Sequence, residues 1–204
     1  MKIICIGRNY AKHARELGNE VPERPVVFLK PSTALLIKDR PLYYPDFTEE
    51  LHYEGELVLR ISRLGKCIDP RFAHRYYDAV TVGIDFTARD LQRVLKSKGL
   101  PWEIAKGWDH SAAIGRWIPI EEIQLPPDQW HFELRKNDTV VQQAQLSDML
   151  WDIPALISYV SQYFTLHIGD MLFTGTPPGV GPVQIGDVLE GYFLGRRVIH
   201  TEIK

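Results

Sequence analysis

Two glutamates separated by one residue, Glu54 and Glu56, are the first side chains in this sequence whose spacing suggests chemistry. They stand where an apolar run begins, and residues two apart in a strand point to the same face. Adjacent carboxylates repel each other and are costly to bury unpaired, but a divalent cation removes both difficulties. The alternative interpretation is a pair of solvated glutamates at a strand edge, which is common for an isolated pair of this kind.

Asp85 adds a third carboxylate to this pair. It ends the apolar run of residues 80–84, where a charged side chain has no evident structural role, and a segment with helix-start signals follows it. Three carboxylate oxygens suit a hard ion such as Mg²⁺ or Mn²⁺, which keeps coordination positions open for water or substrate. A structural zinc site would instead use Cys or His. The three acidic residues therefore form a candidate site for Mg²⁺ or Mn²⁺.

A second candidate feature lies near the start of the sequence, where His13 and Glu16 fall three residues apart in a short predicted helix. Residues at this spacing share a helix face, so the carboxylate can orient the imidazole and raise its basicity. A general base requires such an arrangement. The same spacing also arises by accident on surface helices, so the pair alone does not establish catalysis.

A loop rich in glycine and proline, residues 174–182, follows a late predicted strand. It lacks the Gly-Lys-Ser/Thr ending of a phosphate-binding loop, and no helix pattern follows it, which argues against nucleotide binding. Two interpretations stay open. The loop is either a tight connection or a rigid segment that offers hydroxyl and backbone N–H groups to an anionic substrate.

The elements that must position these side chains are mostly strands. Apolar runs predict strands at residues 1–7, 26–29, 55–61, 80–85, 132–134, 139–142, 171–174, 187–193 and 197–203. Helices are predicted at residues 10–17, 70–77, 87–97 and 153–164, the third with a capping-box-like start at Thr87. Helices scattered among strands in this way favour an α+β fold built on a β-roll or sandwich, and 204 residues suit one domain.

The composition excludes several classes of partner. The formal net charge is -2 and no run of Lys or Arg exceeds two residues, so neither nucleic acid nor an anionic membrane is favoured. No segment has the roughly 18 consecutive apolar residues of a membrane span. Cys5 and Cys67 are too few for a disulfide framework and predict two reduced thiols in a cytoplasmic protein. The expected ligand is a small molecule.

Together these pieces resemble the small, single-domain acylpyruvase branch of the fumarylacetoacetate hydrolase superfamily. The resemblance covers nearly the whole chain in order and spacing. Its motifs are Gly-Arg-Asn-Tyr at 7–10 with His13 and Glu16, Phe-Leu-Lys-Pro-Ser at 28–32, Leu-His-Tyr-Glu-Gly-Glu-Leu at 51–57, Gly-Ile-Asp-Phe-Thr-Ala-Arg-Asp-Leu-Gln at 83–92, Gly-Leu-Pro-Trp at 99–102 with Lys106, and the loop at 174–182. Each motif is weak alone, but together they are highly specific.

The resemblance implies a strand-rich mixed β-roll with a metal at its mouth and a few peripheral helices. It implies that Glu54, Glu56 and Asp85 bind the metal, Mg²⁺ or Mn²⁺. It also implies one catalytic domain over residues 1–204 that forms a homodimer. The expected substrate is a small 2-oxo acid.

The resemblance also implies roles for residues around the metal. His13 and Glu16 are expected to form a dyad carried on a mobile lid of residues 8–24. Lys106 is expected to act as an acid or base beside the substrate. Four further residues match positions that line the substrate pocket in the family: Lys30, Arg89, Gln92 and Thr176.

The predicted reaction is hydrolysis of the C–C bond of an acylpyruvate, R–CO–CH₂–CO–COO⁻, to pyruvate and the acid R–COO⁻. The oxo and carboxylate oxygens would chelate the metal, His13 would take a proton from the attacking water, and Lys106 would stabilise or protonate the metal-bound enolate. The alternative is an oxaloacetate decarboxylase or keto–enol tautomerase, since these reactions pass through the same enolate without activated water. A non-catalytic metal site would require an ion that is fully enclosed by protein, whereas three carboxylate ligands leave coordination positions of the ion open.

Overall fold

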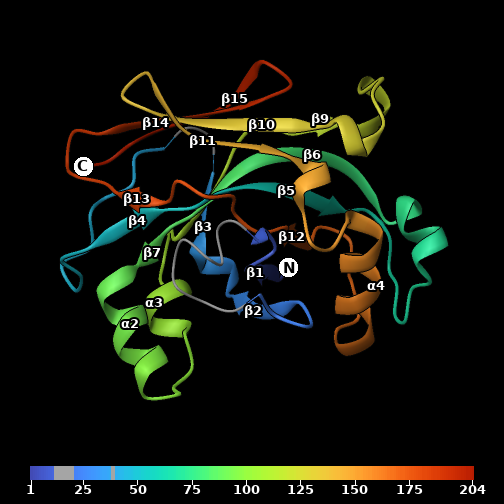
Figure 1. Ribbon diagram of the computed structural model, residues 1–204, viewed down its shortest axis with the longest axis horizontal. Helices are drawn as coiled ribbons and strands as arrows, with labels where there is room; N and C mark the ends of the chain where they lie inside the picture. The colour runs from blue at the N-terminus through green and yellow to red at the C-terminus, as the bar shows by residue number, and fades with distance from the viewer. Residues whose placement is uncertain (12–20, 38–39) are drawn as a thin grey trace.

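The fold of the protein was obtained as a computed structural model, which describes residues 1–11, 21–37 and 40–204 (Figure 1). Within these ranges the largest sheet has eight strands. Its order is β2 (Val26–Lys30), β1 (Ile3–Gly7), β12 (Met171–Phe173), β5 (Gly55–Ile61), β6 (Tyr77–Asp85), β8 (Ala112–Ile114) and β3 (Leu35–Ile37), with β9 (Ile118–Pro119) paired to β6. Because β1 runs parallel to β12 and β3 parallel to β8, while the other pairs are antiparallel, the sheet is mixed.

Two smaller sheets and peripheral helices complete the described fold. One sheet has the order β11 (Thr139–Gln145), β10 (His131–Lys136), β14 (Val188–Phe193), β15 (Arg196–Glu202), and the other β13 (Gly181–Pro182), β4 (Leu51–Tyr53), β7 (Thr87–Ala88). The helices α2 (Arg89–Ser97), α3 (Glu103–Lys106) and α4 (Ile153–Tyr163) lie outside the curled strands (Figure 1). Short 3-10 helices span Ser32–Ala34, Pro70–Arg75, Ile120–Glu122, Pro127–Gln129 and Leu146–Asp148. This architecture confirms the predicted strand-rich α+β class.

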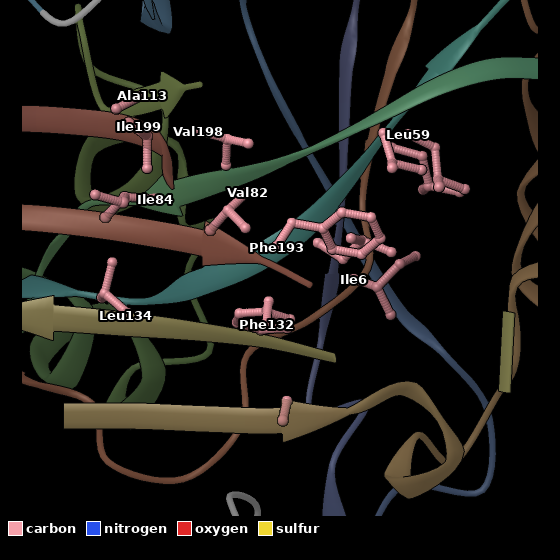
Figure 2. Close-up of a cluster of buried hydrophobic side chains, with 14 of the residues drawn as sticks. Ile6, Leu59, Val82, Ile84, Ala113, Phe132, Leu134, Phe193, Val198 and Ile199 are labelled. Atoms are coloured by element: carbon pink, nitrogen blue, oxygen red, sulfur yellow. The ribbon is translucent and has the colours of Figure 1, made fainter. Parts of the chain in front are cut away.

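The main core lies between the eight-stranded and the four-stranded sheet. Val82 and Ile84 of β6 are fully buried and gather with Phe132 and Leu134 of β10 (Figure 2). The two sheets approach each other closely at Gly191, where a Cβ would lie 2.8 Å from Val82 Cγ1. Because alternate residues of a strand point to opposite faces, burying this side of β5 and β6 leaves their other face to carry the polar site.

Several predicted strands are confirmed. Asn137 and Asp138 form a hairpin turn that joins β10 to β11, with φ of 49° and 64°. The predicted cap at Thr87 is wrong: Thr87 belongs to β7, and Ala88 precedes the helix without a side-chain cap. The strand predicted at residues 26–29 is confirmed as β2, which is an edge strand with Leu29 36% exposed.

The cysteines and the helices agree with the other expectations drawn from the sequence. Cys5 is buried in β1 and Cys67 is exposed, and neither forms a disulfide. Among the helices that the structure describes, none is both long and apolar enough to cross a membrane.

Candidate metal and substrate site

The pairing of β5 with β6 brings the three predicted carboxylates together. Glu56 pairs with Gly83 in the antiparallel register, and the amide of Asp85 donates to the carbonyl of Glu54 at 2.8 Å. Glu54, Glu56 and Asp85 therefore leave the same face of the sheet at one end. All three are buried, and one ligand oxygen from each lies within 4.8 Å of the others.

Three cationic side chains contact these carboxylates. Lys106 Nζ donates to Glu54 Oε2 at 2.8 Å and to Asp85 Oδ2 at 2.7 Å. The guanidinium of Arg89 forms an ion pair with the other oxygen of Glu54, and Lys30 Nζ lies 2.6 Å from Asp85 Oδ1. Buried carboxylates are tolerated only when they are paired in this way or bound to a metal.

Lys30 lies behind the carboxylates, at the end of β2. It is 1% exposed, and its Nζ also donates to Ser111 O at 2.8 Å and to Ser111 Oγ at 3.1 Å. It is not among the residues that line the pocket. These contacts favour a role in positioning Asp85 over the substrate-binding role that the resemblance implied for Lys30.

The glycine-proline loop, residues 174–182, fixes the position of Glu56. The amide of Gly175 donates to Glu56 Oε2 at 2.7 Å. Thr176 Oγ1 donates to the carbonyl of Gly55 at 2.9 Å and accepts a hydrogen bond from Gln142 Nε2 at 2.8 Å. The loop is thus tied along the start of β5, and Thr176 lines the pocket; its binding of substrate stays a prediction.

One face of α2 forms another side of the pocket. Arg89, Gln92 and Lys96 follow the i, i+3, i+7 spacing of a single helix face, and all three line the pocket. Arg89 NH1 donates to Gln92 Oε1 at 2.6 Å, and Arg89 Nε donates to His52 Nδ1 at 3.4 Å. The predicted pair Arg89 and Gln92 is therefore preorganised beside Glu54.

Several pocket residues were not assigned a role from the sequence. Phe28 and Trp102 form an apolar wall, with ring centroids 5.9 Å apart, and Lys106 Nζ lies 5.3 Å from the Phe28 ring centroid. Gln142 lies outside the pocket lining and supports the loop from a buried position in β11. The remaining unassigned lining residues are Ile6, Gly7, Arg8 and Lys96.

Burial and mutual repulsion govern the protonation of this cluster. Burial raises the pKa of Glu56 well above its usual value, and the charges of Asp85 and Glu54 raise it further, while the Gly175 amide opposes this. For Lys106, burial lowers the pKa, but Asp85 and Glu54 outweigh it and raise the pKa overall. A cation between the carboxylates is therefore strongly favoured, and Lys106 remains protonated beside them.

The donor set fits a divalent metal ion of the Mg²⁺ or Mn²⁺ type. It offers carboxylate oxygens from three residues within a short distance of one another, with no sulfur or imidazole among them. Asp85 Oδ1 makes no hydrogen bond within the described structure, although the Lys30 ammonium lies nearby. Glu56 has no cationic side chain within ion-pair distance in the described ranges, so a metal would supply the charge that it lacks.

The predicted dyad cannot be placed in this site. His13 and Glu16 lie outside the described residues, as does most of the predicted lid of residues 8–24. The beginning of that segment is well defined: Asn9 and Tyr10 are buried, and Asn9 Nδ2 donates to the carbonyl of Thr174 at 2.8 Å. The dyad and the lid stay predictions.

Comparison with known proteins shows the family to which the chain belongs. Residues 2–199 match the family model described as fumarylacetoacetate (FAA) hydrolase C-terminal. A protein of Arabidopsis thaliana named as a mitochondrial oxaloacetate tautomerase is 39% identical, covering 100% of this chain and 91% of its own length. A Dictyostelium discoideum protein named as a mitochondrial oxaloacetate decarboxylase is 40% identical, covering 93% of this chain and 87% of its own length.

A solved structure with a bound metal ion agrees in fold. Fumarylpyruvate hydrolase from Pseudomonas aeruginosa, in complex with Mn²⁺ and pyruvate, matches with a TM-score of 0.94 and 36% identity, covering 100% of this chain and 89% of that one. The fold of this chain is thus shared with a metal-containing fumarylpyruvate hydrolase over the whole of its length. This chain belongs to the fumarylacetoacetate hydrolase family, and it is an enzyme of that family.

The carboxylates can be tested by metal binding in the absence of substrate. Glu56→Gln and Asp85→Asn each remove a charged ligand, so we expect the affinity for Mn²⁺ to fall by about 100-fold or more. Loss of a residue that only hydrogen-bonds a metal ligand typically costs about 10–100-fold. Isothermal titration calorimetry measures it directly. Glu122→Gln, which alters an exposed ion pair with Arg196, serves as the control and should leave the affinity unchanged. Wild-type affinity in both ligand variants would refute the site.

The positioning role of Lys30 can be tested through stability. Lys30→Met removes one of the two ammonium groups that contact Asp85 and leaves Asp85 Oδ1 without its cation, so we expect the metal-free protein to lose about 1–3 kcal/mol of unfolding free energy. Saturating Mn²⁺ should restore a larger part of the stability in the variant than in wild type, because the ion then compensates Asp85. Urea denaturation with and without Mn²⁺ measures both quantities. A metal-free variant as stable as wild type would contradict the role.

Proposed function

We propose that this protein is a metal-dependent enzyme that interconverts the enol and keto forms of oxaloacetate. The observation that carries the proposal is the ammonium of Lys106, which touches two of the three carboxylates of the candidate metal site. A group that can carry a proton therefore stands beside the place where an oxo-carboxylate would be held. The names of relatives near 40% identity point to the same substrate.

Tautomerisation needs one proton to move between O2 and C3 of the substrate. Mg²⁺ or Mn²⁺ held by Glu54, Glu56 and Asp85 would hold the oxo-carboxylate oxygens and stabilise the negative charge that develops on them. In the enol-to-keto direction, Lys106 donates a proton to C3 while the enol hydroxyl loses its proton to solvent. Lys106 then regains a proton from solvent, so the reaction is balanced and the reverse path uses the same groups.

The other lining residues orient the substrate and limit its access to water. The guanidinium of Arg89, held by Glu54 and Gln92, lies beside the metal ligands and is placed to contact a substrate carboxylate. Phe28 and Trp102 cover the side of the pocket next to Lys106 with apolar surface. An apolar wall there keeps the electrostatic interactions of Lys106 strong.

Removing the ammonium of Lys106 tests this mechanism. We expect Lys106→Met to slow enol-to-keto conversion of oxaloacetate by about 10²–10⁴-fold, the usual effect of removing a positioned acid or base. Stopped-flow ultraviolet absorbance of the enol, with Mn²⁺ present, gives the rate. Because the methionine also removes charge, Mn²⁺ affinity is measured in parallel. Lys98→Met is the control, and a Lys106→Met rate equal to wild type would reject the mechanism.

Hydrolysis of acylpyruvates, the reaction that the sequence favoured first, is the second candidate function. It is favoured by the similarity to a fumarylpyruvate hydrolase whose structure holds Mn²⁺ and pyruvate. Hydrolysis needs an activated water, for which we propose His13 as the base and Glu16 as the residue that orients it. Decarboxylation of oxaloacetate needs the same electron withdrawal but no such base.

The dyad separates these reactions. We expect His13→Ala to reduce hydrolysis of fumarylpyruvate by about 10²–10⁴-fold, as general-base removal does, and to reduce oxaloacetate tautomerisation and decarboxylation much less. The three rates are measured by ultraviolet absorbance and CO₂ release on one preparation of known metal content. A parallel fall in all three would show that His13 acts through substrate positioning instead of water activation.

Three further properties complete the proposal. The chain acts as one catalytic domain over residues 1–204, with residues 8–24 closing over the bound substrate. It assembles as a homodimer, which multi-angle light scattering would detect as twice the chain mass. It works in the cytoplasm, although relatives include proteins named as mitochondrial, and localisation of the tagged protein in its source cells decides between these compartments.

A further inference from the structure

The pocket has a second charged region besides the carboxylate cluster. Arg8, directly after β1, and Lys96, in the last turn of α2, both line the pocket that contains Glu54, Glu56 and Asp85. Every carboxylate among the lining residues belongs to the candidate metal site. The pocket thus has an acidic part, formed by the three carboxylates and suited to a metal ion, and a basic part, formed by Arg8 and Lys96 from two separate segments.

The position of Arg8 is set by a strained and firmly anchored backbone. Arg8 has φ of 59°, a left-handed conformation that costs a non-glycine residue about 1–3 kcal/mol. The next residue, Asn9, is fully buried, and its side chain bonds the carbonyls of Thr174 and Trp151 at 2.8 and 3.1 Å. A Cβ at Gly175 would lie 2.7 Å from Asn9 Cβ, so the loop that holds Glu56 also packs against Asn9. The same contacts therefore fix both regions of the pocket.

Lys96 is directed to the same region by its place on α2. It lies two turns beyond Arg89 on the helix face that carries Gln92, and this face borders the pocket. Burial lowers the pKa of Lys96, and the positive charges of Arg8 and Arg89 lower it further, while Glu54 raises it. Because Arg8 directly follows β1 and Lys96 lies in α2, the fold brings basic side chains from two separate elements to one pocket, and neighbouring positive charges attract an anion.

We propose that Arg8 and Lys96 bind a carboxylate at the far end of the substrate, so that the pocket selects 2-oxo dicarboxylic acids over 2-oxo monocarboxylic acids. This inference rests on the proposed function for the placement of the oxo-carboxylate end at the metal. The two ends of the substrate would then meet opposite environments: a divalent cation at the three carboxylates, and the guanidinium of Arg8 with the ammonium of Lys96 at the basic part of the pocket. Charge-assisted hydrogen bonds of this kind give both affinity and orientation.

Two stable probes of equal size test this subsite without turnover. N-oxalylglycine has an oxo-carboxylate end and a distal carboxylate, and N-isobutyloxamate has the same end with an isopropyl group in place of that carboxylate. We expect the full-length, Mn²⁺-loaded protein to bind N-oxalylglycine at least about tenfold more tightly, the effect of a hydrogen bond to a charged group. Isothermal titration calorimetry gives both dissociation constants.

Variants assign the preference to the two residues. Arg8→Gln and Lys96→Met should each remove most of the preference for N-oxalylglycine while the affinity for N-isobutyloxamate stays within about twofold. Lys98→Met is the matched control: it is exposed on the same helix end and outside the lining, and it should keep the wild-type ratio. If Arg8→Gln does not fold because of its backbone position, two other variants decide the question. Lys96→Met should lose the preference for N-oxalylglycine, whereas Arg8→Lys keeps the charge and should keep the preference.

The outcomes separate this inference from the proposed function. Equal affinities of wild type for the two probes, or an unchanged ratio in both Arg8→Gln and Lys96→Met, would overturn the subsite. A tenfold preference that the variants abolish would support it, even if oxaloacetate is not turned over. In that case the subsite would stand and the tautomerase assignment would fall.

Discussion

The structure depends on keeping three carboxylates buried within a few ångströms of one another. Glu54, Glu56 and Asp85 would repel strongly in a site that excludes water, so each must be compensated by a neighbouring group. The compensation comes from different parts of the chain: Lys30 from β2, Arg89 from α2, Lys106 from α3, and the amide of Gly175 from the loop after β12. Local elements that look unrelated along the sequence are thereby tied to one place.

This arrangement also supports the enolate chemistry that we propose for the site. The compensation is uneven among the described residues, since Lys106 bridges Glu54 and Asp85 while Glu56 receives a backbone N–H and no ammonium or guanidinium group from them. A divalent cation would complete the neutralisation and leave the Lys106 ammonium at its edge, next to bound substrate. Hydrolysis, decarboxylation and tautomerisation of 2-oxo acids all require negative charge to be stabilised at this point, which accounts for their occurrence within one family.

The sequence allowed the carboxylate cluster and the strand-rich class to be predicted, for a physical reason. Carboxylates at the end of an apolar strand conflict with burial, and such conflicts mark functional sites. Contacts between residues far apart in the sequence could not be predicted from the sequence alone. Lys30 and Asp85 are 55 positions apart, and only the sheet order shows that Lys30 supports Asp85 from behind instead of facing the pocket. Likewise, Arg8 lines the same pocket as Lys96 from a left-handed backbone conformation, which no local sequence pattern predicts.

The central claim is that Glu54, Glu56 and Asp85 together bind one divalent cation. The most direct test is a crystal structure of the protein grown with Mn²⁺, with anomalous diffraction collected on both sides of the manganese absorption edge. The account predicts a single strong anomalous peak per chain, with an oxygen of each of the three carboxylates at about 2.0–2.2 Å, as expected for a small hard cation. Manganese bound elsewhere, with Lys106 still bridging Glu54 and Asp85 and no peak between the three carboxylates, would contradict it.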